Sequence, residues 1–185
     1  GYVYSGPVAA YGYKAVEGKG IKTVIILGFS HRKYFEGVSI YAGDSWKTPL
    51  AEIAVDTAMA QAIISSNPRF RFQKELFEDE NSIEMQIPFI QMALGEMVQI
   101  VPIAFGNQNY SDAQALAKVI ADMVKDRSDC LIVASTDLSH FHPYEIASGK
   151  DKALIAMFEK GNAEAIYDAY AKEEAEACGM GPVLT

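Results

Sequence analysis

The chain has 185 residues, of which 50% are hydrophobic and 22% are charged. This balance is typical of a soluble globular protein and excludes a disordered or collagen-like chain. At this length one large core is a better expectation than two small ones, so we predict a single domain over residues 1–185. The lack of Met at position 1 and of a tail-like pattern at the end predicts that this domain is truncated at both ends.

The net charge is −8, from 16 Lys and Arg against 24 Asp and Glu. A field of this sign argues against a nucleic acid or a membrane as the partner and favours a cation. No signal peptide is recognisable, and the longest apolar run, residues 24–27, is far shorter than the about 20 residues of a membrane helix. Because Cys130 and Cys178 form no disulfide framework, we predict a cytoplasmic protein with free thiols.

The predicted elements alternate along the chain. Stretches rich in β-branched residues predict strands buried on both faces at residues 23–27, 98–104 and 130–134. Helical patterns lie at residues 50–65, 83–94, 113–125, 151–159 and 163–172. Ser111 and Gln114 have the spacing of a capping box, and Pro102 weakens the second strand because it lacks a backbone donor. The alternation predicts an α/β fold with a central, mainly parallel or mixed sheet flanked by helices.

All three histidines follow a predicted strand. His31 comes after residues 23–27, and His140 and His142 come after residues 130–134. Ligands of open α/β sheets bind outside the carboxyl ends of the strands, so the chain carries these residues to the edge where a site is expected. A single histidine in such a loop is usually a surface or capping residue. With three of three there, and Asp137 nearby, that explanation and a functional site are about equally good.

Asp137 and His140 are three residues apart, a spacing at which a carboxylate and an imidazole share a metal ion or form a hydrogen-bonded pair. Such a set suits divalent iron, zinc or copper, and a thiolate favours the softer ions. Cys178 is the candidate thiol, because Cys130 is expected in a buried strand. The alternative is that Cys178 is an inert structural residue.

An acidic segment precedes and enters the second predicted helix. Most of its carboxylates, at residues 78–80, are typical of a solvated helix start. Glu84 lies in an apolar run, where its carboxylate needs a partner, and we interpret it as a residue that orients a ligand histidine. Tyr2 lies in a turn-rich first segment that either lines a pocket or packs. Tyr2 and Glu84 are therefore the candidate cofactor-binding residues.

Several motifs occur in the order seen in a known family. They are GYVYSG at residues 1–6, LGFSH at 27–31, WKTPL at 46–50, SIEMQIPF at 82–89, STDLSH at 135–140 and CG at 178–179. In this order they resemble the Memo family, called AmmeMemoRadiSam system protein B in prokaryotes. The resemblance spans essentially the whole chain and implies a prokaryotic, Memo-like domain.

The resemblance implies a fold similar to class III extradiol dioxygenases, which are non-haem iron enzymes, and a metal site at the strand ends. Carried onto this sequence, the metal ligands are His31, Asp137, His140 and Cys178, and the catalytic candidates are His31, His140 and Asp137. The family pattern has a further histidine directly before the position of Gly1, which lies outside the given chain. Asn81 stands where the family usually has histidine.

Three functions follow as hypotheses. The leading one is a Memo-type metal-binding protein, with iron or copper as the cofactor and oxidoreductase-like, dioxygenase-like chemistry of unsettled kind. The second is a non-catalytic module that binds a small molecule or a peptide in the same pocket, which Tyr2, Tyr4, Trp46 and Phe141 line and where His31 forms hydrogen bonds. The third is action through a partner protein of a radical-SAM system, which the family name joins to this domain.

Overall fold

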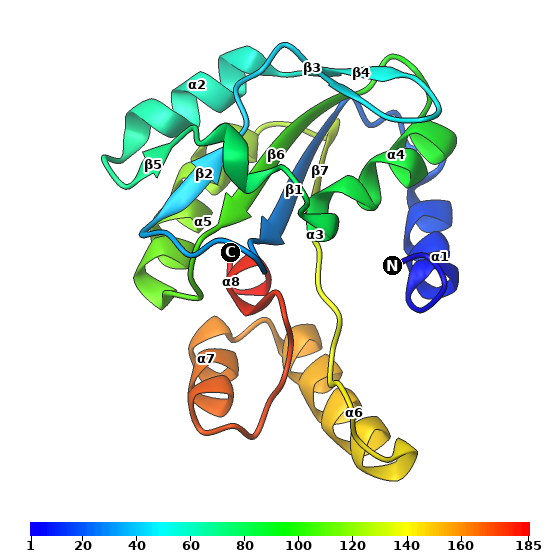
Figure 1. Ribbon diagram of the computed structural model, residues 1–185, viewed down its shortest axis with the longest axis vertical. Coiled ribbons are helices and arrows are strands. Elements are labelled where there is room, and N and C mark those ends of the chain that lie inside the picture. The colour runs from blue at the N-terminus through cyan, green and yellow to red at the C-terminus, as the bar shows by residue number, and fades with distance from the viewer.

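A computed structural model describes residues 1–185 as a seven-stranded mixed sheet flanked by helices (Figure 1). The predicted α/β fold class is therefore confirmed. Five strands follow the order β3-β4-β6-β1-β7, and β2 pairs with β6 and carries β5 at its outer side. The strands are β1 (Thr23–Phe29), β2 (Val38–Ile40), β3 (Ser45–Lys47), β4 (Glu52–Val55), β5 (Phe70–Arg71), β6 (Gln99–Phe105) and β7 (Cys130–Ala134).

The three strands predicted from the sequence form the centre of the sheet. β1 lies between β6 and β7 and is parallel to both, so these strands end at the same edge. β1 and β6 are buried almost throughout, as predicted. β7 is different, because it is the last strand of the path and its residues are half-buried or exposed. The prediction that this strand, with Cys130, is buried on both faces is wrong for that reason.

Pro102 is accommodated inside β6 at a change of partner. On the side of β6 away from β1, β4 pairs as far as Ile100 and β2 pairs from Ile103 onward. The carbonyl of Pro102 accepts a hydrogen bond from Tyr41 on this side, at 2.9 Å. Since the N–H and C=O of a strand residue point to the same side, the missing donor of Pro102 falls between the two partners, where no ladder bond is lost.

The helices cover both faces of the sheet, and side chains alternate between two cores. Ile25 and Leu27 of β1 contribute to one core, with α2, α5 and α8, and Val24 and Ile26 contribute to the other, with α1, α3 and α4. The helices are α1 (Gly6–Val16), α2 (Thr57–Ser66), the 3-10 helix η1 (Lys74–Leu76), α3 (Asn81–Glu84), α4 (Gln86–Leu94), α5 (Tyr110–Val124), α6 (Tyr144–Lys160), α7 (Ala163–Ala171) and α8 (Met180–Val183).

Two predicted helices differ from the observed ones for identifiable reasons. The first half of the helix predicted at 50–65 is strand β4, whose burial alternates, and α2 begins only after Asp56, which caps it by accepting the Met59 N–H at 2.9 Å. The helix predicted at 83–94 is interrupted at Met85. Pro88 has no N–H to donate to the carbonyl of Glu84, four residues earlier, so the helix starts again as α4.

The remaining helices differ mainly at their ends. α5 begins before the predicted capping box, because Asn109 is its cap and accepts the Ser111 N–H at 2.9 Å. α6 begins seven residues earlier than the predicted 151, directly after Pro143. α7 follows its prediction, and α1, α8 and the short strands β2, β3 and β5 were not predicted. No helix of the structure is both long and apolar enough to cross a membrane.

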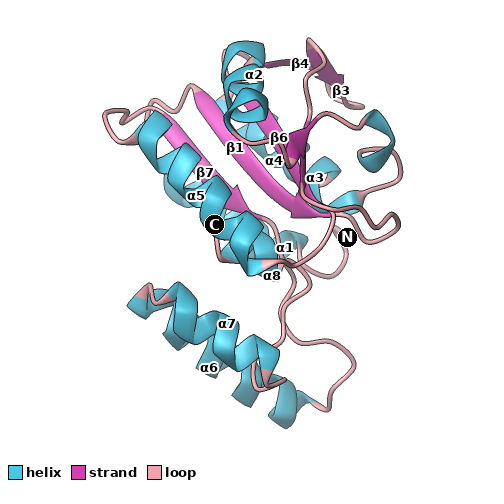
Figure 2. Cartoon of the chain, turned by 90° about the vertical axis from the view of Figure 1, so that its left-hand side faces the viewer, coloured by secondary structure: helices cyan, strands magenta, loops and turns pink.

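Figure 2 shows α6 and α7 lying together below the sheet and joined to it by loops. A stacked pair of rings, Tyr110 of α5 and Tyr167 of α7, connects the two layers, with ring centroids 4.6 Å apart. Leu154 and Ile166 also join the larger core from these helices. The segment from β7 to α8 therefore leaves the sheet, packs as a helical pair and returns to the sheet edge.

A test of the contact between β1 and α3 uses Gly28. A Cβ at this position would lie 2.5 Å from Ser82 Oγ and 2.6 Å from Ile83 Cγ1, so Gly28→Ala should force α3 away from the strand. We expect a loss of about 1–3 kcal/mol in the free energy of unfolding, measured by urea denaturation. Gly12→Ala, on an exposed face of α1 with no atom within 4 Å, is the control and should gain about 0.5–1 kcal/mol. Equal stability of the two variants would contradict the close packing of α3.

Candidate functional site

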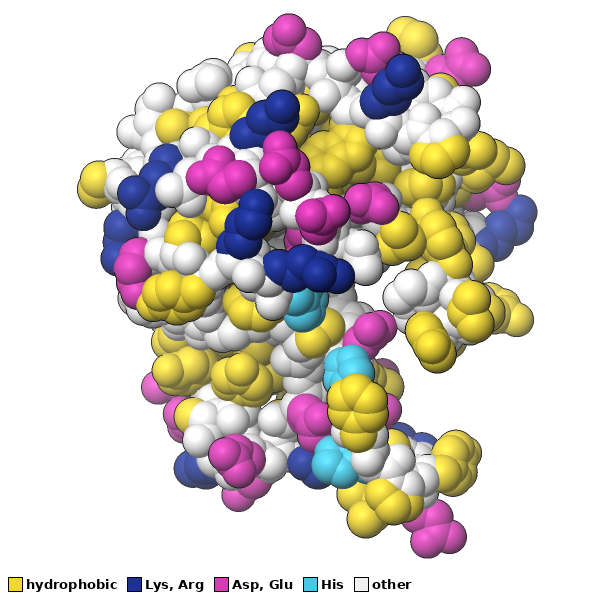
Figure 3. Space-filling view, viewed as in Figure 1, with side chains coloured by type: hydrophobic (Ala, Val, Ile, Leu, Met, Phe, Trp, Pro, Cys, Tyr) yellow, Lys and Arg dark blue, Asp and Glu magenta, His cyan; other side chains and the backbone are white.

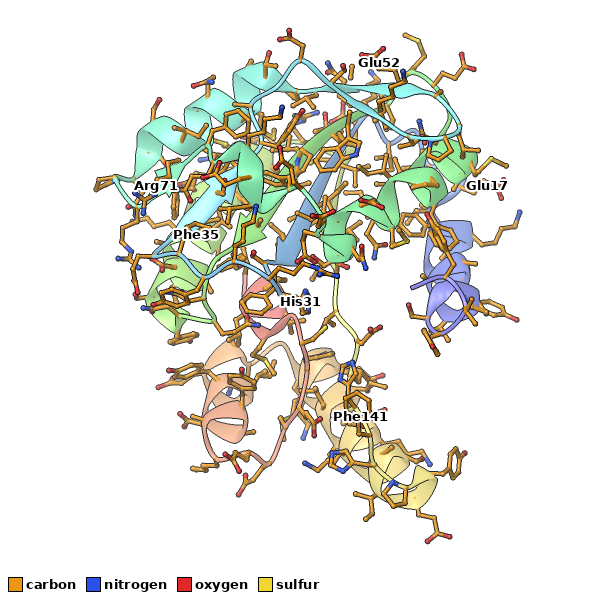
Figure 4. The ribbon with its side chains drawn as sticks, viewed as in Figure 1. Glu17, His31, Phe35, Glu52, Arg71 and Phe141 are labelled. Atoms are coloured by element: carbon orange, nitrogen blue, oxygen red, sulfur yellow. The ribbon has the colours of Figure 1, made fainter.

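The candidate site lies where β1, β6 and β7 end at the same edge of the sheet. His31 follows β1, Gln108 follows β6, and Thr136 and Asp137 follow β7. Cys178 reaches this edge from the later part of the chain, directly before Gly179, the N-cap of α8. In Figure 4 the labelled His31 side chain lies at this edge, below α3. Segments far apart in the sequence therefore meet around one histidine.

Glu80 is the buried carboxylate that fixes His31. Glu80 is only 3% exposed. Its Oε2 accepts the backbone N–H of His31 at 2.7 Å, and its Oε1 lies 3.0 Å from His31 Nδ1 and accepts the Ser82 N–H at 2.8 Å. Because Nδ1 is held in this way, Nε2 is the ring nitrogen that remains for another partner.

Cys178 is held by the loops that follow β6 and β7. Its Sγ accepts the backbone N–H of Asp137 at 3.1 Å and lies 3.8 Å from Thr136 Oγ1. The backbone N–H of Cys178 donates to the Asp137 carbonyl at 3.1 Å, and the Gln108 amide donates to the Cys178 carbonyl at 2.6 Å. At Gly179 a Cβ would lie 2.4 Å from the Ser135 carbonyl oxygen, so glycine is required for this approach.

His31 and Cys178 interact, and each changes the protonation of the other. The interaction with Cys178, followed by that with Glu80, raises the pKa of His31 to about 10. Burial by itself raises the pKa of Cys178, but His31, the Asp137 amide and Thr136 outweigh it and lower the pKa. Burial likewise opposes the hydrogen bonds from His31 and Ser82 that lower the pKa of Glu80. These shifts favour the protonated form of His31 and make the ionised forms of Glu80 and Cys178 easier to reach.

Asp137 and His140 form a second, looser pair. The distance between Asp137 Oδ2 and His140 Nε2 is 3.8 Å, longer than a hydrogen bond. No three His, Cys, Asp or Glu side chains of the chain converge closely enough to hold a metal ion. The four predicted metal ligands are thus arranged as two pairs, His31 with Cys178 and Asp137 with His140. The backbone of Asp137, bonded to Cys178, connects them.

Glu176 fixes the loop that carries the other two histidines. It accepts the backbone N–H of His140 at 3.0 Å, and its Oε2 lies 2.7 Å from His142 Nε2 and 3.4 Å from Lys150 Nζ. These contacts, that of the His140 backbone first, lower the pKa of Glu176 to about 2. Phe141, between the histidines, has φ +61° and is fully exposed, at a distance from His31 in Figure 4. In Figure 3 the histidine side chains run from the sheet-bearing body toward the lower helices, beside an open notch.

Tyr2 and Glu84 lie elsewhere, as two lining residues of a cavity of about 500 Å³ that Trp46 also lines. Of the other residues predicted to share a pocket with them, Tyr4 and Phe141 are exposed, and His31 is not in the lining of this cavity. The carboxylate that contacts His31 is Glu80, whereas Glu84 lines this cavity.

Sequence reasoning missed Glu80 because it grouped this residue with its acidic neighbours. Glu80 does begin a helix, as the N-cap of α3, but it is buried while Glu78 and Asp79 are exposed. The available signal was its position three residues before Ile83, which places both residues on the same side of the helix. Since Ile83 faces the core, so does Glu80.

Comparison with known proteins places this chain in a family. The whole chain, residues 1–185, matches the family described as Memo-like protein. The chain belongs to this family, as the motifs around His31, Asp137 and Cys178 predicted.

Named relatives come from archaea and bacteria. The chain is 35% identical to a MEMO1 family protein of Sulfolobus acidocaldarius, with 100% of this chain and 66% of the relative covered. It is 35% identical to a MEMO1 family protein of Pyrobaculum aerophilum, with 99% and 66% covered, and 35% identical to one of Thermotoga maritima, with 100% and 67% covered. The chain therefore spans about two thirds of the length of these relatives.

The two cysteines should differ in reactivity. The pKa of Cys178 is lowered by its partners, whereas burial raises the pKa of Cys130. In metal-free protein, alkylation by iodoacetamide should therefore reach half its maximal rate at a lower pH for Cys178 than for Cys130, because the thiolate is the nucleophile. Mass spectrometry of the peptides measures both rates. Glu80→Gln should move the Cys178 profile to higher pH, and identical profiles for the two cysteines would contradict the His31–Cys178 interaction.

Proposed function

We propose that the strand-end site is a metal centre of an oxidoreductase-like protein, with His31 and Cys178 as the ligands that the chain supplies. The observation that carries this proposal is the line Glu80–His31–Cys178. In this line a buried carboxylate holds Nδ1 of the histidine, and the interaction of the histidine with Cys178 raises the pKa of His31 and lowers that of the thiol.

The line has the features that metal ligands need. A ligating histidine commonly donates its other ring N–H to a carboxylate, which fixes the ring and increases its basicity. The thiolate, and not the thiol, is the form of cysteine that binds metal. The Asp137 amide stabilises the negative sulfur, and Glu80 fixes the ring that faces it. His31 would have to release the Nε2 proton to bind a metal, and the charge of the metal would then replace that of the imidazolium.

The chemistry of the donors fits copper or iron. A donor set of imidazole and thiolate prefers softer ions and therefore suits copper(I) better than iron(II). With only two protein donors, the ion would take further ligands from water or a substrate. Asp137 and His140 are the nearest additional donors along the chain, 3.8 Å from one another. A bound copper or iron ion would supply one-electron redox chemistry, while the protein supplies orientation and charge. The relation to extradiol dioxygenases and the radical-SAM partner stay predictions from the resemblance.

Metal content tests the proposal directly. The protein is loaded anaerobically with copper(I) or iron(II), desalted and analysed by mass spectrometry of the metal. We expect about one metal ion per wild-type chain and at least about tenfold less affinity in His31→Ala and Cys178→Ser, because each removes one of two donors. Glu80→Gln keeps the shape of the side chain and should weaken binding by about 10- to 100-fold.

The controls are residues of the same type outside the line. Cys130→Ser changes the cysteine at the sheet edge, and His142→Ala changes the histidine held by Glu176. Both variants should keep wild-type metal content. Equal content in wild type, His31→Ala and Cys178→Ser would overturn the proposal.

A further inference from the structure

A second cavity lies outside the strand-end site. Its volume is about 500 Å³, which is the size of a site for a small organic molecule. Tyr2 comes to it from the N-terminal segment, Trp46 and Lys47 from β3, and Glu84 from the end of α3. None of these residues belongs to the line Glu80–His31–Cys178, so the cavity has no part in the proposed metal centre.

The two aromatic walls are held in place by other rings. Tyr2 makes an edge contact with Phe89, at 5.6 Å between ring centroids, and Phe89 stacks on Tyr13 at 5.3 Å. Trp46 packs at 5.0 Å against Tyr41, and at 6.0 Å against Phe77. Rings that are already fixed lose little freedom when a ligand binds, so this cavity is organised in advance for binding.

Glu84 gives the cavity its charge. Its side chain is half-buried, and no hydrogen bond or ion pair from another residue reaches its carboxylate. The negative charge also contributes, after burial, to the raised pKa of Tyr2, which indicates that the carboxylate lies near this ring. A carboxylate and aromatic rings that line one cavity both attract a cation, the carboxylate by its charge and the rings through their negative faces.

We propose that this cavity binds a small organic amine in its ammonium form, with the charge against Glu84 and the apolar body between Tyr2 and Trp46. The net charge of −8 favours the approach of a cation. Lys47 lines the same cavity and opposes the cation, but its side chain is exposed and leaves the carboxylate unpaired. This proposal does not depend on the metal centre.

Trp46 is the only tryptophan of the chain, so its fluorescence reports on this cavity. We use three probes of similar shape: phenethylammonium, the neutral 2-phenylethanol and the anionic phenylacetate. Phenethylammonium should bind at least about tenfold tighter than either of the others. Glu84→Gln should remove about that factor, and Tyr2→Leu should weaken binding where Tyr2→Phe does not, because a phenyl ring keeps its negative face.

Two further variants identify the site and the sign of its charge. Trp46 also lines a neighbouring cavity of about 180 Å³ that contains Glu78, so Glu78→Gln is the matched control and should leave affinity unchanged. Lys47→Met should keep or increase the affinity for phenethylammonium. Tighter binding of phenylacetate, loss of amine binding in Lys47→Met, equal binding of all three probes, or no binding of phenethylammonium would overturn the proposal.

Discussion

The strand-end site depends on the hydrogen bonds of one buried carboxylate, that of Glu80. It accepts the backbone N–H of His31, contacts the ring of that residue and accepts the Ser82 N–H in the first turn of α3. Ser82 adds two bonds of 3.2 Å to the backbone of Phe29, one donated and one accepted. Gly28 allows this approach, because any side chain there would meet Ser82 and Ile83. Without this carboxylate, the N–H groups of His31 and Ser82 would lose their partner. The carboxylate therefore joins α3 to the loop that follows β1.

The second half of the site comes from the far end of the chain. Between β7 and Cys178 the chain forms α6 and α7 and then returns to the sheet edge. There the Asp137 N–H donates to the Cys178 thiol, and the side-chain amide of Gln108 donates to the Cys178 carbonyl. The imidazole and the thiol therefore belong to separately fixed loops, and their contact requires both loops to be in place. A rigid scaffold of parallel strands with variable loops at its edge is well suited to this task.

The sequence predicted the elements whose patterns are long and whose burial is complete. β1 and β6 are apolar runs in a central position, and residues 163–172 show the period of α7. The motifs also predicted a metal site with His31 and Cys178 among its ligands, which stays a prediction. What could not be predicted depended on partners distant in sequence: the exposure of β7 at the sheet edge, the contact of His140 with Glu176, and the burial of Glu80, which bonds the loop after β1. β4 was not predicted, although its apolar and polar residues alternate, because these residues were assigned to the longer helical pattern that includes α2.

The most direct test of the metal centre is the sulfur ligand itself. X-ray absorption spectroscopy at the metal edge of the protein loaded with copper(I) distinguishes sulfur from nitrogen and oxygen neighbours. We expect one sulfur neighbour together with nitrogen in the wild type and in Cys130→Ser, and loss of the sulfur in Cys178→Ser. A wild-type spectrum with only nitrogen and oxygen neighbours would contradict the assignment of Cys178 and His31 as the ligand pair.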